Sequence, residues 1–152
     1  MENWRMLLEN KNAVIYGGGG SIGSARGSLR LRPGGHEGLI AGRTLERLEA
    51  VVEEILSAGG RAEATVIDAL DEGAVDEHAD SVAASAGSID ISFNLISHGD
   101  VQGLPLAEMS LEDFERPIRT AVRTQFLTSR GGVPHDRAGD GGDPHVRRQW
   151  GS

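Results

Sequence analysis

Apolar and polar residues follow two alternating periods along the chain, and the alternation predicts strands that take turns with helices. Four short apolar runs have the length and composition of buried strands: 13–16, 39–41, 64–67 and 89–96. Three longer segments have helical spacing or helix-start signals: 45–58, 71–86 and 110–129. Because strands and helices alternate with short connections, we predict an α/β fold with a doubly wound parallel sheet of about four strands and helices on both faces.

The helix ends carry their own signals. Thr44 is placed to cap the first helix and Gly59 to stop it, and Ser110 begins a capping-box-like start of the third. Pro117 lies inside that third helix, so we expect it to bend the helix or delay its start. The side chains predicted to face the core are Leu45, Leu48, Val52, Ile55 and Leu56 in the first helix and Val75, His78 and Val82 in the second.

A glycine-rich loop follows the first predicted strand directly. Residues 12–23 read Asn-Ala-Val-Ile-Tyr-Gly-Gly-Gly-Gly-Ser-Ile-Gly. Glycine lets the backbone turn sharply and approach phosphate oxygens, and the next helix start supplies amide donors. No Lys-Ser/Thr pair follows, so the loop is not a P-loop. The pattern predicts a pyrophosphate site in a dinucleotide-binding Rossmann-type domain, with a flexible turn as the plainer alternative.

Composition narrows the class of protein. The 152 residues have a formal net charge of −8 and scattered basic residues, which speaks against a nucleic-acid partner. There is no cysteine for a disulfide, and no apolar run approaches the roughly 18 residues of a membrane span. Residues 1–10 lack the layout of a signal peptide, so we expect a cytoplasmic protein with no membrane association. No metal site is predicted, because the His and Asp spacing near the end matches neither an EF-hand nor a zinc motif.

On these residues the chain resembles the short-chain dehydrogenase/reductase family over about 11–129. The glycine motif of that family, Thr-Gly-x-x-x-Gly-x-Gly, falls on Tyr16, Gly17, Ser21 and Gly23. Ser21 replaces the middle glycine, and Gly20 beside it is placed to take over the close approach. The resemblance implies that Gly17, Gly20, Ser21, Ile22 and Gly23 hold the pyrophosphate of a nicotinamide cofactor.

The resemblance also implies further cofactor contacts. Arg43, with Thr44, matches the position after the second strand that accepts an adenosine 2′-phosphate, which favours NADP over NAD. Asp68 matches the residue beside the adenine ring, and Asn94 the residue that steadies the sheet and lines the ribose side. The plainer alternatives are a solvated helix-start arginine at Arg43 and a helix cap at Asp68. The three residues after Asn94 depart from the family's Asn-Asn-Ala-Gly.

The catalytic part of the family pattern is missing from the chain. The family passes a proton through a Tyr-x-x-x-Lys pair, but Tyr16 is the sole tyrosine and Lys11, the sole lysine, precedes it. We therefore assign no catalytic residue. The implied reaction is hydride transfer between NADP(H) and a small alcohol or carbonyl substrate, and we expect this truncated chain to be inactive alone. A non-catalytic nucleotide-binding module and the unstable product of a damaged gene are the alternatives. A homo-oligomer also stays open, since relatives commonly pair through the helix ending near residue 129.

Two stretches interrupt the pattern. Residues 27–35 place proline and glycines where the first crossover helix must continue, and 131–152 have almost no apolar residues. We predict a partial Rossmann domain over 1–130 and a disordered tail over 131–152. A shifted reading frame would explain both stretches, and the coding DNA tests this hypothesis.

Overall fold

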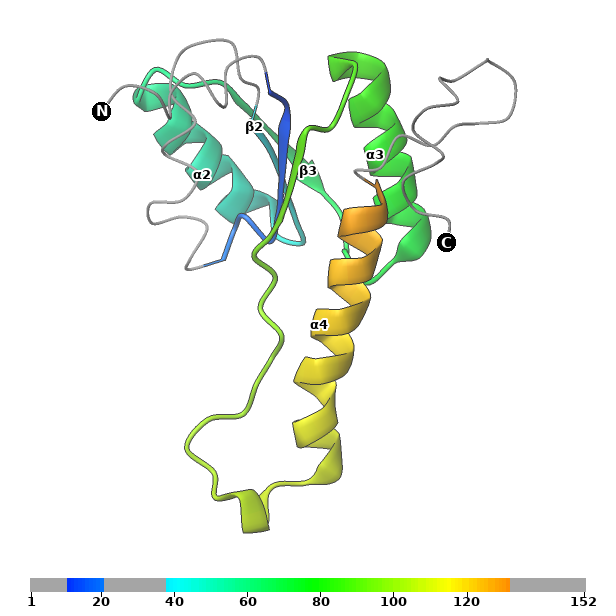
Figure 1. Cartoon of the computed structure of the whole chain (residues 1–152). Coiled ribbons are helices and arrows are strands. Elements are labelled where there is room, and N and C mark those ends of the chain that lie inside the picture. Colours follow the sequence, from blue (N-terminus) through cyan, green and yellow to red (C-terminus); the bar gives the residue numbers. More distant parts are fainter. Residues whose placement is uncertain (1–10, 21–37, 132–152) are drawn as a thin grey trace, which may run out of the picture.

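The computed structural model describes residues 11–20 and 38–131, which form a parallel four-stranded sheet with helices on both faces (Figure 1). The strands are β1 (Ala13–Tyr16), β2 (Gly38–Gly42), β3 (Ala62–Val66) and β4 (Ile91–Asn94). They lie in the order β3-β2-β1-β4, and every neighbouring pair is parallel. The predicted Rossmann-type fold is confirmed.

The helices divide between the two faces. Helix α2 (Leu45–Ser57) packs on one face, and α3 (Glu72–Ala86) and α4 (Leu111–Gly131) lie on the other (Figure 1). A 3-10 turn, η3 (Leu106–Glu108), precedes α4 at the far end of a long connection from β4. Several predictions concern residues that the structure does not describe: the first crossover helix, the frame-shifted segments, the disordered tail, and the cofactor residues Ser21, Ile22 and Gly23. Of the predicted tail, Gly131 is described, and it closes α4.

The central strands are buried on both faces, which explains their continuous apolar sequence. Alternate residues of β1 point to opposite sides: Val14 and Tyr16 pack toward α3 and α4, and Ile15 packs toward α2. All four residues of β1 are buried. The layer on the α2 side consists of Ile15, Ile40, Leu48, Val51 and Ile55. The sheet therefore has one small core on each face.

The predicted core face of α2 is partly wrong. Leu45 and Leu56 are 45 % and 54 % exposed, whereas Val51 is buried beside Leu48 and Ile55. These three buried residues follow i, i+3, i+7 spacing, and the two exposed leucines lie at the helix ends, off that stripe. The helix stops where predicted, because Gly59 takes φ +79° and the amides of Gly59 and Gly60 bond back to the last turn.

Three strands also differ from the prediction in their bounds. Strand β2 covers 38–42 instead of 39–41, β3 covers 62–66 instead of 64–67, and β4 covers 91–94 instead of 89–96. Among the described strands, β4 pairs only with β1, which is four residues long, so the regular ladder ends at Asn94. Beyond it, Leu95 N still donates to Tyr16 O at 2.8 Å, but Ile96 N turns to the Asn94 side chain. Apolar character thus continues past the paired segment.

The two helices on the other face keep their predicted starts. Asp71 caps α3 by accepting from Ala74 N at 3.1 Å, and Val75, His78 and Val82 are buried as expected. Ser110 Oγ accepts from Asp113 N at 3.1 Å. Helix α4 begins at Leu111, before Pro117, so the expected delay is wrong.

Candidate nucleotide-binding site

The glycine loop leaves β1 at the carboxyl edge of the sheet and is held by the neighbouring strands. The amides of Gly17 and Gly18 both donate to Ala41 O, at 2.8 and 3.3 Å, and Gly20 N donates to Gly17 O at 3.0 Å. Gly17 has φ +79°, and a Cβ there would lie 2.7 Å from the Leu95 carbonyl carbon. Packing therefore demands glycine at this position, independently of any ligand.

A cleft of about 340 Å³ opens beyond the carboxyl ends of the strands. Its floor is the glycine loop, where Gly17, Gly19 and Gly20 line it with backbone alone. Residues that follow the other described strands, and residues of α4, also line the cleft. They include Arg43, Thr44 and Arg47 after β2, Asp68–Leu70 after β3, Leu95–Gly99 after β4, and Arg116, Thr120 and Thr124 on α4. Ligands of open α/β sheets bind at this edge.

The cleft is basic although the chain is acidic. Among the described residues that line it, three are arginines and one, Asp68, is a carboxylate, in a chain of net charge −8. Arg43 and Arg47 have no ion pair within the described part of the chain, and both lie at the start of α2. Thr44 occupies the N-cap position, but its side chain makes no capping hydrogen bond. A helix start with two cations and an uncommitted hydroxyl suits an anion.

Asp68 and Asn94 lie at the cleft in different ways. Asp68 lines it, and its Oδ1 accepts from Leu70 N at 3.0 Å. Asp68 is not the N-cap of α3, since Asp71 holds that position. Asn94 lies beneath the lining: its Nδ2 donates to Thr124 Oγ1 at 3.2 Å, and its Oδ1 accepts from Ile96 N at 3.0 Å. Asn94 thereby fixes the start of the loop that lines the cleft.

Tyr16 is held in the core by a buried partner. Its hydroxyl lies 3.4 Å from His78 Nδ1, and the two rings meet edge to face at 5.8 Å. Burial, with a smaller effect of the Asp76 charge, raises the pKa of Tyr16 to about 12. Burial also lowers the pKa of His78. A phenol with this pKa stays protonated at neutral pH, so Tyr16 is poorly suited to proton transfer.

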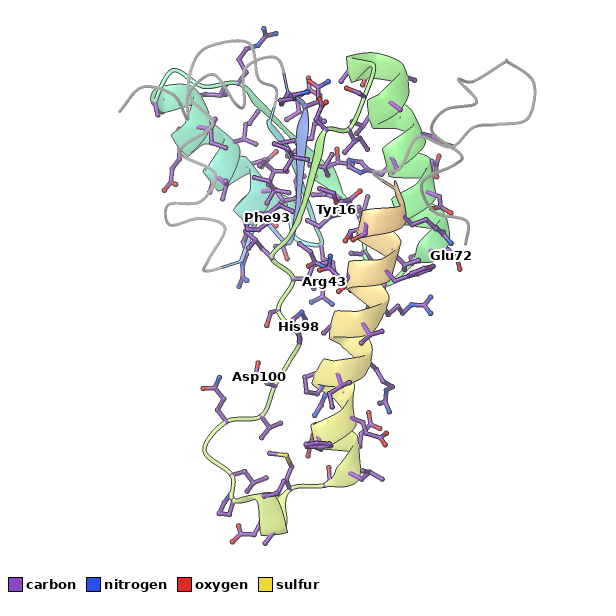
Figure 2. The ribbon with its side chains drawn as sticks, viewed as in Figure 1. Tyr16, Arg43, Glu72, Phe93, His98 and Asp100 are labelled. Atoms are coloured by element: carbon purple, nitrogen blue, oxygen red, sulfur yellow. The ribbon has the colours of Figure 1, made fainter. Side chains whose placement is uncertain are left out.

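The loop after β4 contains His98 and Asp100, residue types that occur in catalytic triads, but it does not assemble a triad. Figure 2 shows His98 and Asp100 succeeding each other along an extended segment. The Asp100 carboxylate accepts from Gln102 Nε2 at 2.7 Å, and this hydrogen bond lowers the pKa of Asp100. Within the described residues, no group of three or more His, Cys, Asp or Glu side chains is placed to hold a metal ion.

The sequence prediction missed the cleft residues Arg47, Arg116 and Thr120. Arg47 lies in the first turn of the predicted helix, close in the sequence to Arg43, which precedes the cap, and this closeness to the helix start is a usable signal. Arg116, Thr120 and Thr124 also recur every four residues. The other residues of the cleft come from elements that are separate in the sequence, so helical spacing alone does not reveal what these three residues face.

Comparison with known proteins gives the family. The short chain dehydrogenase family model matches residues 11–143. The uncharacterized oxidoreductase YxbG of Bacillus subtilis is 34 % identical over 127 residues, which cover 84 % of this chain and 46 % of that protein. The chain therefore belongs to the short-chain dehydrogenase/reductase family, as the resemblance implied.

Solved structures agree with this assignment. A short-chain type dehydrogenase/reductase from Mycobacterium marinum superposes with a TM-score of 0.68 at 29 % identity, over 82 % of this chain and 49 % of that one. A metagenomic short-chain oxidoreductase in complex with NADP gives 0.66 at 28 % identity, over 84 % and 57 %. The chain thus spans about half the length of the relatives it matches. None of its described helices is long and apolar enough to cross a membrane.

Proposed function

We propose that the chain binds NADP in the cleft, as the nucleotide-binding part of an oxidoreductase. One observation carries the proposal: at the carboxyl edge of the parallel sheet, an acidic chain gathers three arginines around a floor of bare glycine backbone. The similar metagenomic oxidoreductase in complex with NADP supports this choice of cofactor.

The proposed contacts divide by chemistry. The amides of the glycine loop face the pyrophosphate, and Arg43 with Thr44 takes the 2′-phosphate, because a cation and a free hydroxyl suit a dianion. Asp68 lies toward the adenine, and Asn94 positions the loop on the ribose side. For the pyrophosphate we propose Gly17, Gly20, Ser21, Ile22 and Gly23.

Bound cofactor would donate hydride to a small carbonyl substrate as NADPH, or accept it from a small alcohol as NADP⁺. The 152 residues of the chain hold no Tyr-x-x-x-Lys pair to move the accompanying proton, and Tyr16 is buried against His78. We therefore propose that this chain alone binds the cofactor without turning over. Hydride-transfer assays with a panel of carbonyl compounds test this, and turnover equal to that of a full-length relative would contradict it.

Replacing Arg43 by alanine tests the cofactor assignment. Loss of a charge-assisted contact to the 2′-phosphate should weaken NADP binding by about 10- to 100-fold and leave NAD binding within about twofold. Isothermal titration calorimetry measures both affinities. Arg61→Ala is the matched control, because Arg61 is exposed before β3 and does not line the cleft. Equal losses for both nucleotides, or no NADP binding by the unaltered chain, would contradict the assignment.

We further propose that two copies pair through the outer face of α4. That face carries an apolar stripe at four-residue spacing, with exposed fractions from 49 % to 66 %: Phe114, Ile118, Val122 and Phe126. Such a stripe is costly in water unless it is covered. Analytical ultracentrifugation should find a dimer, and a monomer at high concentration would contradict pairing.

We also propose a cytoplasmic location, on the composition of the chain.

If the chain were the unstable product of a damaged gene, we would expect aggregation instead of a stable dimer. Such a product would leave the open edge of β4 and the apolar stripe to drive aggregation. Cooperative thermal unfolding of the purified chain, with a Tm that rises when NADP is added, would exclude that alternative.

A further inference from the structure

Helix α4 turns two different faces to its surroundings. The apolar stripe is exposed on the outside. A second stripe, also at four-residue spacing, lines the cleft and is polar: Arg116, Thr120 and Thr124. Thr124 is buried and accepts a hydrogen bond from Asn94, whereas Arg116 and Thr120 have no role in the cofactor contacts proposed above.

The cleft-facing stripe lies on the same side of the cleft as the loop after β3. Arg123 Nε donates to Leu70 O at 3.0 Å, which ties the middle of α4 to that loop. Arg116 lies seven residues, about two turns, before Arg123. It lines the same cleft as Asp68 and Leu70. Arg116 therefore lines the cleft together with the residues that are proposed to lie beside the adenine.

Arg116 and Arg43 differ in how their charges are matched. The Arg116 guanidinium pairs through Nη2 with the Asp113 carboxylate one helical turn earlier, whereas Arg43 has no ion pair among the described residues. A neutralised guanidinium is a poor phosphate ligand, but its plane still stacks on an aromatic ring. In addition, Arg116 Nε is shielded from solvent and has no partner in the described part of the chain. A buried donor of this kind calls for an acceptor.

We infer that Arg116 contacts the adenine base of the bound nucleotide, by stacking its guanidinium plane or by donating to a ring nitrogen. The inference rests on the proposed function and adds to it a residue of α4, on the opposite face of the sheet from α2, the helix that Arg43 precedes. Arg43 then selects the 2′-phosphate, and Arg116 holds the base that NADP and NAD share.

Arg116→Ala should weaken NADP and NAD alike, by roughly five- to tenfold each, because the base is common to both. Binding of nicotinamide mononucleotide, which has no adenine, should be unchanged. Arg119→Ala is the matched control: Arg119 is on the same helix, pairs with Glu112 and Glu115, and does not line the cleft. Calorimetry gives all of these affinities.

Two further variants keep the test decisive. Arg116→Met retains the stem of the side chain and replaces Arg116→Ala if that variant fails to unfold cooperatively. Arg116→Lys retains the charge but lacks both the guanidinium plane and the Nε donor, so it should bind as weakly as the alanine variant. Unchanged affinities, a loss confined to NADP, or full rescue by lysine would overturn the inference. If the unaltered chain binds no nucleotide, the proposed function fails and this inference with it, whereas intact binding by Arg116→Ala overturns the inference alone.

Discussion

Two regions of the molecule differ in how far their apolar residues are buried: the carboxyl edge of β1 and β2, and the outer face of α4. At the first, β1 is buried throughout, and Gly17 lies against the backbone just after β4 with no space for a side chain. At the second, Val122 and Phe126 are 66 % and 61 % exposed, and Phe93 on the edge strand β4 is 50 % exposed (Figure 2). The contrast shows a closely packed cleft at the edge of the sheet and an uncovered apolar surface on α4.

The largest expected effect comes from Gly17→Ala at the packed end. A Cβ there would lie 2.7 Å from Ile96 N, at a backbone with φ +79°. We expect the free energy of unfolding to fall by about 3 kcal/mol or more, because backbone strain adds to a clash with the neighbouring strand. Urea unfolding followed by circular dichroism measures the loss.

Gly59→Ala is the matched control for this prediction. Gly59 has the same φ, +79°, but a Cβ there would meet nothing within 4 Å. Its replacement should cost only the backbone strain, about 1 kcal/mol. Equal losses at the two glycines would show that the packing of the glycine loop does not matter.

A smaller effect, visible only at alkaline pH, is expected from Tyr16. Its pKa is raised to about 12 in the folded chain, mainly by burial, so the unfolded chain ionises first as the pH rises through about 10. The stability that Tyr16 contributes is therefore complete below pH 10 and is lost toward pH 12, by roughly 2–3 kcal/mol.

Tyr16→Phe isolates this loss. The variant cannot ionise at this position, so its free energy of unfolding should fall less between pH 10 and pH 12 than that of the unaltered chain. At pH 7 the two should agree within about 1 kcal/mol, since only the 3.4 Å contact to His78 is removed. Parallel curves for the two proteins across the alkaline range would contradict the buried position of the phenol.

The smallest effect on stability is expected on the α4 side. Val122→Asp should change the free energy of unfolding of the monomer by no more than about 0.5 kcal/mol, because Val122 is exposed. The same variant should abolish pairing in analytical ultracentrifugation, since it places a charge within the apolar stripe. A large loss of monomer stability would show instead that this face packs within the chain.

The accuracy of the sequence prediction followed the sharpness of the local signals. Strand β1 was placed to the residue, because Asn12 and Gly17 bound its apolar run. Helix α3 was placed almost as well, because Asp71 caps it and Gly87, at φ +87°, ends it. The limits of β4 were wrong because its apolar run outlasts the strand it pairs with.

Only the cleft residues that directly follow a strand could be predicted from the sequence. The glycine loop, Arg43 and Asp68 each follow a strand directly, so parallel topology brings them to one edge. Arg116 reaches the same cleft from α4 through packing between elements that are distant in the sequence. Asn94 lies beneath the cleft lining, where its side-chain amide hydrogen-bonds Thr124 and Ile96, and no sequence pattern indicated these bonds.

Titration of NADP into the isotopically labelled chain, followed by amide nuclear magnetic resonance, is the sharpest test of the proposed nucleotide cleft. We expect the signals of Gly19, Gly20 and Thr44, around the cleft, to shift in a saturable way, while those of Val122 and Phe126 stay in place. Shifts confined to the outer face of α4, or no saturable shifts at all, would contradict a nucleotide site at the carboxyl edge of the sheet.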